Sequence, residues 1–187
     1  FMRFVQFRVP SCVDQVRCVL AIPQKRAVSR VVAHLSLAEM KAILDSPELD
    51  TRLGIRDRAM LHLCFAAGLR VSELVGLCLP DVRLQPAPTI LVHGKGRRER
   101  ILPLWKQAAT DLRAWLAIRG EAPTPELFLN ASDASMTRSG FAYVLRKHAG
   151  VAATRCPSLK KRRVSPHVLR HTCAMTILQA AGDLRRV

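Results

Sequence analysis

The sequence has no apolar run of about 18 residues, the length that a helix needs to cross a membrane. It also begins without the charged stretch followed by an apolar stretch that marks a secretory signal. Both absences argue against a membrane partner, and we expect a cytoplasmic protein. Of the 187 residues, 49% are hydrophobic and 24% are charged, which is typical of a globular domain with a good core.

Closely paired cysteines are missing as well. Six cysteines are present, but none forms a C-x-x-C pair, and no Cys/His spacing matches a zinc site. Cys64 and Cys173 lie within apolar helical patterns, which predicts buried, reduced thiols in a reducing compartment. We therefore expect no zinc site, and we expect no other cofactor.

Acidic residues are scarce. The chain carries 30 Lys and Arg against 14 Asp and Glu, and no acidic residue occurs between Ala134 and Gly182. This net charge of +16 predicts a polyanionic partner, nucleic acid above all. An anionic membrane is the alternative, weakened because no helix joins a basic face to an aromatic-rich apolar face. The residues expected to contact the nucleic acid are Arg97, Arg98, Arg138, Lys147, Lys160, Lys161, Arg162 and Arg163.

The chain divides into a short front part and a main domain. Residues 1–22 are predicted to form two short helical stretches whose apolar side chains need a partner surface. Residues 23–34 are polar and basic, begin with proline, and are interpreted as a linker. The main domain then covers residues 35–187. Because the chain begins with Phe1, we expect it to be a fragment.

Local signals in the main domain predict mostly helices. Ser36 and Glu39 form a capping-box pattern that starts a helix reaching about Asp45. Further helices are predicted over residues 55–68, after a Ser72 cap, over residues 106–119, and after a cap at Thr137 or Ser139. Strand signals occur at 81–85, 89–94 and 98–104, with one tight hairpin. The expected fold is mainly α with a small three-stranded antiparallel sheet (α+β).

The last predicted helix, in 164-VSPHVLRHTCAMTILQAAGD-183, raises a chemical question. Ser165 caps it, so its positive end carries His167, Arg170 and His171 on one face. Cations are disfavoured at a helix N-terminus, and a bound anion there would explain their presence. The opposite face is expected to lie in the core and consists of Leu169, Cys173, Thr176, Ile177 and Ala180.

Two further motifs carry candidate residues. In 68-GLRVSELVGL-77, Arg70 either binds a ligand or pairs structurally with Glu73 or Asp57. In 94-GKGRRER-100, Lys95 lies between two glycines and is either a functional amine or a solvated turn lysine; the motif does not match a Walker loop. Arginine forks bind phosphate oxygens and stabilise a phosphoryl transition state, and a lysine can protonate a leaving oxygen. The combined set suits a phosphodiester but lacks a nucleophile.

GLRVSEL, the GKG hairpin and HVLRH, in this order and at this spacing, resemble the catalytic domain of tyrosine recombinases, the phage-integrase family, over about residues 34–187. The resemblance implies a mostly helical fold with a three-stranded sheet and a double-stranded DNA partner. It further implies that Arg70 and Arg170 grip the scissile phosphate and that Lys95 is the general acid for the 5′-oxygen. His167 would assist the nucleophile. Glu73 and His171 would be supporting residues.

In this family the nucleophile is a tyrosine beyond the HVLRH helix. The only tyrosine of this chain, Tyr143, lies upstream of that helix and is interpreted as a core or surface position. We expect a full-length parent to break and rejoin DNA through a 3′-phosphotyrosine, as a tetramer on DNA, and this chain not to cleave alone. By the same resemblance, residues 1–22 are the remnant of an N-terminal core-binding helical domain, and the origin is bacterial or phage.

Other interpretations stay open at this point. The chain could be a non-enzymatic DNA-binding remnant of a decayed integrase, or it could receive its tyrosine from another protomer. A type IB topoisomerase shares the arginine–lysine–arginine chemistry, although the short basic chain and the close motif match favour a recombinase. A metal-dependent nuclease would need ligands such as His62, His93, His167 and His171, and its carboxylates are too few and misplaced.

Overall fold

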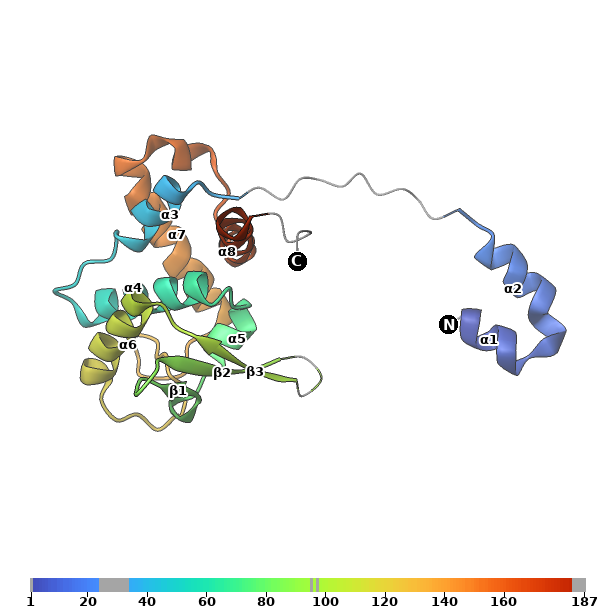
Figure 1. Cartoon of the computed structure of the whole chain (residues 1–187), viewed down its shortest axis with the longest axis horizontal. Helices are drawn as coiled ribbons and strands as arrows, with labels where there is room; N and C mark the ends of the chain where they lie inside the picture. The colour runs from blue at the N-terminus through green and yellow to red at the C-terminus, as the bar shows by residue number, and fades with distance from the viewer. Residues whose placement is uncertain (1, 24–33, 95, 97, 183–187) are drawn as a thin grey trace. The chain divides into compact units, whose positions relative to one another are not determined.

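The computed structural model describes residues 2–23, 34–94, 96 and 98–182, which fall into two compact units, residues 1–31 and residues 32–187 (Figure 1). The first unit contains helix α1 (Met2–Arg8), the 3-10 turn η1 (Pro10–Cys12) and helix α2 (Val13–Leu20). Phe4 and Phe7 on α1 are exposed. Within the described part of the chain, no helix is long and apolar enough to span a bilayer.

The second unit opens with two capped helices. Helix α3 (Leu37–Leu44) has the predicted capping box, because Ser36 accepts a hydrogen bond from the Glu39 backbone and the Glu39 carboxylate accepts one from the Ser36 backbone. Helix α4 (Arg52–Ala66) begins three residues earlier than predicted, since Thr51 Oγ1 caps it by accepting from the Gly54 N–H at 3.0 Å. Most of α4 is buried, and this helix forms the centre of the core.

A tight connection leads from α4 to helix α5 (Val71–Val75). It passes through Gly68, whose φ of +55° is readily adopted only by glycine. The predicted Ser72 cap is wrong. Arg70 is the N-cap residue, and its backbone N–H donates to Glu73 Oε2 at 2.9 Å, so the carboxylate of Glu73 satisfies the helix start. Ser72 lies exposed within the helix.

The predicted sheet is confirmed. Strands β1 (Val82–Arg83), β2 (Thr89–His93) and β3 (Glu99–Pro103) form an antiparallel sheet in the order β1-β2-β3, after a 3-10 turn η2 (Leu79–Asp81). On β2, Ile90 and Val92 are buried, as expected for a sheet with one face on the core. His93 pairs with Glu99 in the register of β2 and β3, as expected for strands joined in a hairpin.

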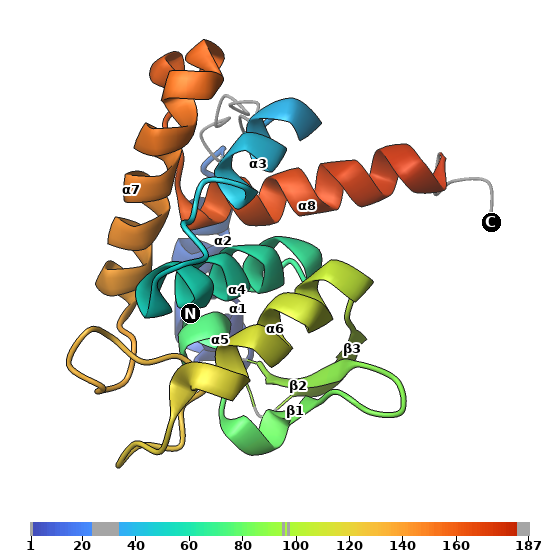
Figure 2. The same ribbon diagram turned by 90° about the vertical axis from the view of Figure 1, so that its left-hand side faces the viewer.

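The remaining helices enclose α4. Helix α6 (Lys106–Arg119) packs along α4, and its Leu112 and Trp115 are fully buried. Helix α7 (Arg138–Arg155), capped by Thr137 rather than Ser139, packs against α3 and leads through η3 (Pro157–Lys161) to α8 (Pro166–Ala181). Helix α8 packs against α4 and lies above it in the view of Figure 2. The mainly α fold with a three-stranded antiparallel sheet is therefore confirmed.

The predicted core face of α8 is correct only over its first half. Leu169 and Cys173 are buried, but Ile177 is 49% exposed and Ala180 is exposed. The second half of α8 extends beyond the elements that cover the first half (Figure 2). Helical periodicity identifies an apolar stripe but not the length of the surface that covers it, which explains this error.

The packing of α6 on α4 predicts a large stability loss for Leu112→Ala. Because Leu112 is fully buried, its truncation leaves a cavity and is expected to lower the free energy of unfolding by about 2–5 kcal/mol. The control Ile118→Ala, on the same helix and 38% exposed, should cost less than about 1 kcal/mol. Urea unfolding monitored by circular dichroism measures both; equal losses would contradict this packing.

Candidate active site

The carboxylate of Glu73 lies at the centre of an arginine cluster. Its side chain is only 4% exposed. Oε1 accepts hydrogen bonds from Arg70 Nη1 at 2.9 Å and Arg100 Nη1 at 3.2 Å, and Oε2 accepts one from Arg100 Nη2 at 2.8 Å. Arg170 Nη1 lies 3.9 Å from Oε2. One buried carboxylate is therefore shared by guanidinium groups from the start of α5, from β3 and from α8.

These contacts keep Glu73 ionised. Burial raises the pKa of Glu73, but hydrogen bonds from Arg100 and Arg70 outweigh burial and lower the pKa from 4.5 to about 2. Three guanidinium groups around one carboxylate leave an excess of positive charge. That excess favours an anion at the exposed side of the cluster.

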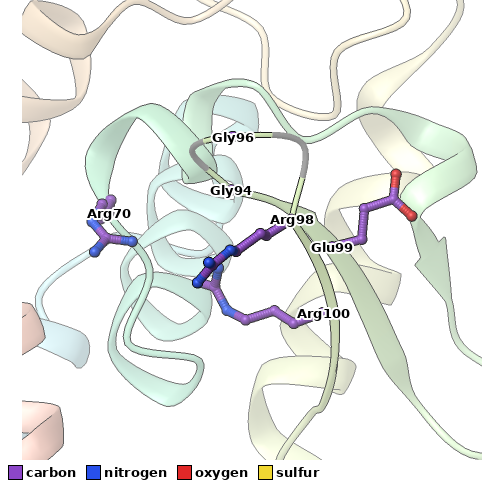
Figure 3. A pocket seen from close by; sticks show the side chains of 6 residues that line it. All are labelled: Arg70, Gly94, Gly96, Arg98, Glu99 and Arg100. Atoms are coloured by element: carbon purple, nitrogen blue, oxygen red, sulfur yellow. The ribbon is translucent and has the colours of Figure 1, made fainter.

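A pocket of about 710 Å³ opens beside this cluster. Figure 3 shows Arg98 and Arg100 extending from the hairpin toward Arg70, while Glu99 points away from them. Strand alternation explains this arrangement, since residues two apart lie on the same face. The described residues that line the pocket are Arg70, Gly94, Gly96, Arg98, Glu99 and Arg100.

Arg170 joins α8 to the same cluster. Its Nη1 donates a hydrogen bond to the carbonyl oxygen of Gly68, in the connection that leads to Arg70. The structure thus brings together the two arginines that the sequence motifs singled out. Two structural partners were considered for Arg70, and the structure shows that it pairs with Glu73. The other candidate, Asp57, instead pairs in the core with Arg56 at 2.6 Å and with His148 at 2.9 Å.

The two histidines of the HVLRH motif lie at the start of α8. Ser165 Oγ caps this helix by accepting from the Val168 N–H at 3.4 Å, as predicted. His167 is exposed in the first turn. His171 is half-buried, and its ring lies edge-on to that of His34 with centroids 6.2 Å apart. Neither histidine is among the residues that line the arginine pocket.

The hairpin base is held on both strands. Gly94 N–H donates to the Arg98 carbonyl oxygen at 2.7 Å, and the His93 ring lies between Asp81 (3.0 Å) and Glu99 (3.1 Å). The hydrogen bond to Asp81 raises the pKa of His93. Lys95 and Arg97, the predicted general acid and a predicted DNA contact, lie outside the described residues.

Of the described residues that were predicted to bind DNA, Arg98 lines the pocket and the others lie outside it. Arg138, Lys160, Lys161 and Arg163 are exposed on α7, on η3 and just after η3. Two have acidic neighbours: Lys147 Nζ lies 4.0 Å from Asp57 Oδ2, and Arg162 Nε lies 3.4 Å from Glu39 Oε1.

Sequence reasoning missed Arg100, whose guanidinium group donates two hydrogen bonds to Glu73. The alternation of 98-RER-100 was the available signal, because it places Arg98 and Arg100 on one face of the strand and Glu99 on the other. The pairing with Glu73, 27 residues away, is tertiary and has no sequence signature.

Tyr143 is the only tyrosine of the chain, and it lies on α7 with 63% of its surface exposed. It lines a separate pocket together with Asp57 and Lys147. No described residue lines both this pocket and the arginine pocket. Among the described residues, no group of three or more His, Cys, Asp or Glu side chains lies together in a way that could hold a metal.

The buried charge of Glu73 predicts a pH-dependent stability. Its pKa is lower in the folded chain than its ordinary value of 4.5, so its contribution is full above about pH 4.5 and is lost as pH falls toward 2. Glu73→Gln should therefore be less stable at pH 7 by on the order of 2 kcal/mol, and the deficit should shrink below pH 4.5. Urea unfolding across pH 2–7 measures this, with exposed Glu121→Gln as the control. A deficit that does not change with pH would contradict the ionised network.

Solved structures share this architecture. The crystal structure of XerA recombinase matches 99% of this chain and 65% of its own, with a TM-score of 0.71 and 24% identity. A post-cleavage complex of XerH site-specific recombinase with palindromic difH substrate matches 87% of this chain and 47% of its own, with a TM-score of 0.72 and 24% identity. These likenesses show the tyrosine recombinase fold.

Similarity in sequence is higher among curated relatives. A putative integrase/recombinase, y4rC of Sinorhizobium fredii, is 38% identical over 98% of this chain and 55% of its own length. Tyrosine recombinase XerD of Ralstonia nicotianae is 34% identical over 100% of this chain and 60% of its own. The chain thus spans little more than half the length of these relatives. Residues 33–187 match the model of the phage integrase family, and the chain therefore belongs to this family as a tyrosine recombinase catalytic domain.

Proposed function

We propose that this domain holds a phosphate of duplex DNA in the arginine pocket, as part of a site-specific recombinase that breaks and rejoins DNA. The observation that carries the proposal is the set of guanidinium groups from Arg70, Arg100 and Arg170 around the buried Glu73 carboxylate. The XerH match supports DNA as the partner, because that relative is seen with its difH substrate.

The chemistry of the cluster fits a phosphodiester. Arginine forks bind phosphate oxygens bidentately, and they stabilise the additional negative charge of a pentacoordinate transition state. We assign the scissile phosphate to Arg70 and Arg170 and the protonation of the 5′-oxygen to Lys95, with assistance to the nucleophile from His167. Glu73 supports Arg70, and His171 is a supporting residue. These roles follow from the motif resemblance.

The surface charge extends the proposed contact beyond the pocket. We propose that the exposed residues Arg138, Lys160, Lys161 and Arg163 contact neighbouring phosphates, together with Arg98 at the pocket. In the parent, we propose that residues 1–22 are the end of a core-binding domain, that residues 23–34 link it to the catalytic domain of residues 35–187, and that protomers assemble as a tetramer on DNA.

We further propose that these 187 residues bind DNA without cleaving it. Tyr143 is the only tyrosine, and it lines a pocket that shares no described residue with the arginine pocket. The covalent step is therefore assigned to a tyrosine outside this sequence, from a longer protein or from another protomer.

Duplex-DNA binding tests the role of the pocket. The chain should bind a fluorescent duplex with an affinity that falls steeply with salt, because bound counterions are released. Arg70→Ala and Arg170→Ala should each weaken binding by about tenfold or more and lower the salt slope by about one. Fluorescence anisotropy across a salt series measures both quantities.

Arg113→Ala is the matched control for this experiment. Arg113 is exposed and donates to the Leu84 carbonyl oxygen, away from the described lining of the pocket. Its removal also costs one positive charge and should change affinity much less. Arg70→Ala and Arg170→Ala variants that bind like this control would overturn the assignment of the phosphate to Arg70 and Arg170.

A nicked suicide substrate tests the covalent step. Incubation with the chain, followed by a denaturing gel, should give no protein–DNA adduct, because Tyr143 lies at a separate pocket. Adding a tyrosine-bearing relative that lacks its own first arginine tests donation of the tyrosine between protomers. An adduct that forms with the chain alone and disappears in Tyr143→Phe would show that Tyr143 is the nucleophile and refute the proposal.

A further inference from the structure

Arg100 lies between the hairpin and the start of α5. It is the second residue of β3, and its side chain is 35% exposed. Nη1 and Nη2 donate to Oε1 and Oε2 of Glu73 at 3.2 and 2.8 Å, which is a bidentate fork. We propose that Arg100 is a positioning residue that fixes Glu73, and through it Arg70, in the orientation that receives a phosphate; this inference rests on the proposed function.

The division of labour between the two arginines follows from their contacts. Within the described part of the chain, Arg100 directs both terminal nitrogens to Glu73, whereas Arg70 directs only Nη1 to it. Arg70 is also more exposed, at 57% against 35% for Arg100. Arg70 thus retains donors for a ligand, while Arg100 is committed to the carboxylate.

The same fork ties the hairpin to the helix start. Arg100 is two residues beyond Arg98, whose carbonyl oxygen closes the turn by accepting from Gly94 N–H. Its neighbour Glu99 lies on the other face of the strand and pairs with His93, which also contacts Asp81. The hairpin base is therefore held on both faces, and the Arg100 fork sets its distance from Arg70.

Removing Arg100 changes the contacts that the Arg70 side chain can make. The Glu73 carboxylate would lose its fork, and Arg70 is the nearest guanidinium that could replace it. An Arg70 that turns fully onto Glu73 is withdrawn from the pocket. If Arg100 were instead an independent phosphate ligand, its loss would leave the geometry of Arg70 unchanged. The two roles therefore differ in whether the effects of Arg70 and Arg100 add.

A double-mutant cycle on duplex-DNA affinity separates these roles. Arg100→Gln should weaken binding about tenfold, but it should cause little further loss in an Arg70→Ala background. Arg100→Lys keeps the charge and loses the fork, so it should bind as weakly as Arg100→Gln. Arg113→Gln controls for the loss of one positive charge. Additive losses, or full affinity in Arg100→Lys, would overturn the proposal.

A second measurement, on the free chain, keeps this inference separate from the proposed function. The nitrogen-15 chemical shift of the Arg70 Nε–H group should change in Arg100→Gln, because Arg70 then turns from the pocket onto Glu73. If DNA binding does not depend on the arginines, the proposed function is refuted. The NMR measurement on the free chain then still tests the positioning role of Arg100. An Arg70 signal that is unchanged in a folded Arg100→Gln variant would refute that role.

Discussion

The buried carboxylate of Glu73 is the constraint on which the site depends. Burial of an ionised carboxylate costs several kcal/mol unless charged hydrogen-bond donors surround it. Here the donors come from Arg70 at the start of α5 and from Arg100 on β3, with Arg170 of α8 at 3.9 Å. Three elements that are distant in sequence must therefore meet at one point for Glu73 to remain charged. The fold and the site are stabilised by the same contacts.

Helix α4 makes this meeting possible. It lies in the core and packs against both α6 and α8 (Figure 2). Its end leads through Gly68, at a φ of +55°, to Arg70. A Cβ at Gly68 would lie 3.2 Å from the Cys173 sulfur, so α8 packs directly on this turn. Because Arg170 precedes Cys173 by one helical turn, the packing that buries Cys173 also brings Arg170 to the Gly68 carbonyl oxygen.

The limits of sequence reasoning follow from the range of each interaction. The Ser36 and Ser165 caps and the antiparallel pairing of β2 with β3 are local, and the sequence predicted them correctly. The Ser72 cap was wrong because the carboxylate of Glu73 competes for the helix start. The fork from Arg100 to Glu73 joins residues that are 27 positions apart in the sequence. The exposure of Ile177 depends on which elements lie beside α8. Neither feature is encoded in a local sequence pattern.

Glu73 also explains how several arginine side chains can lie close together before an anion binds. Guanidinium groups held close repel one another, and long side chains lose rotamer entropy when a ligand orders them. A shared carboxylate offsets the repulsion and orders the side chains before the ligand arrives, which lowers the entropic cost of binding. Because a single carboxylate cannot neutralise three guanidinium groups, the site keeps a positive excess. A phosphate therefore meets donors that are already oriented and only partly neutralised.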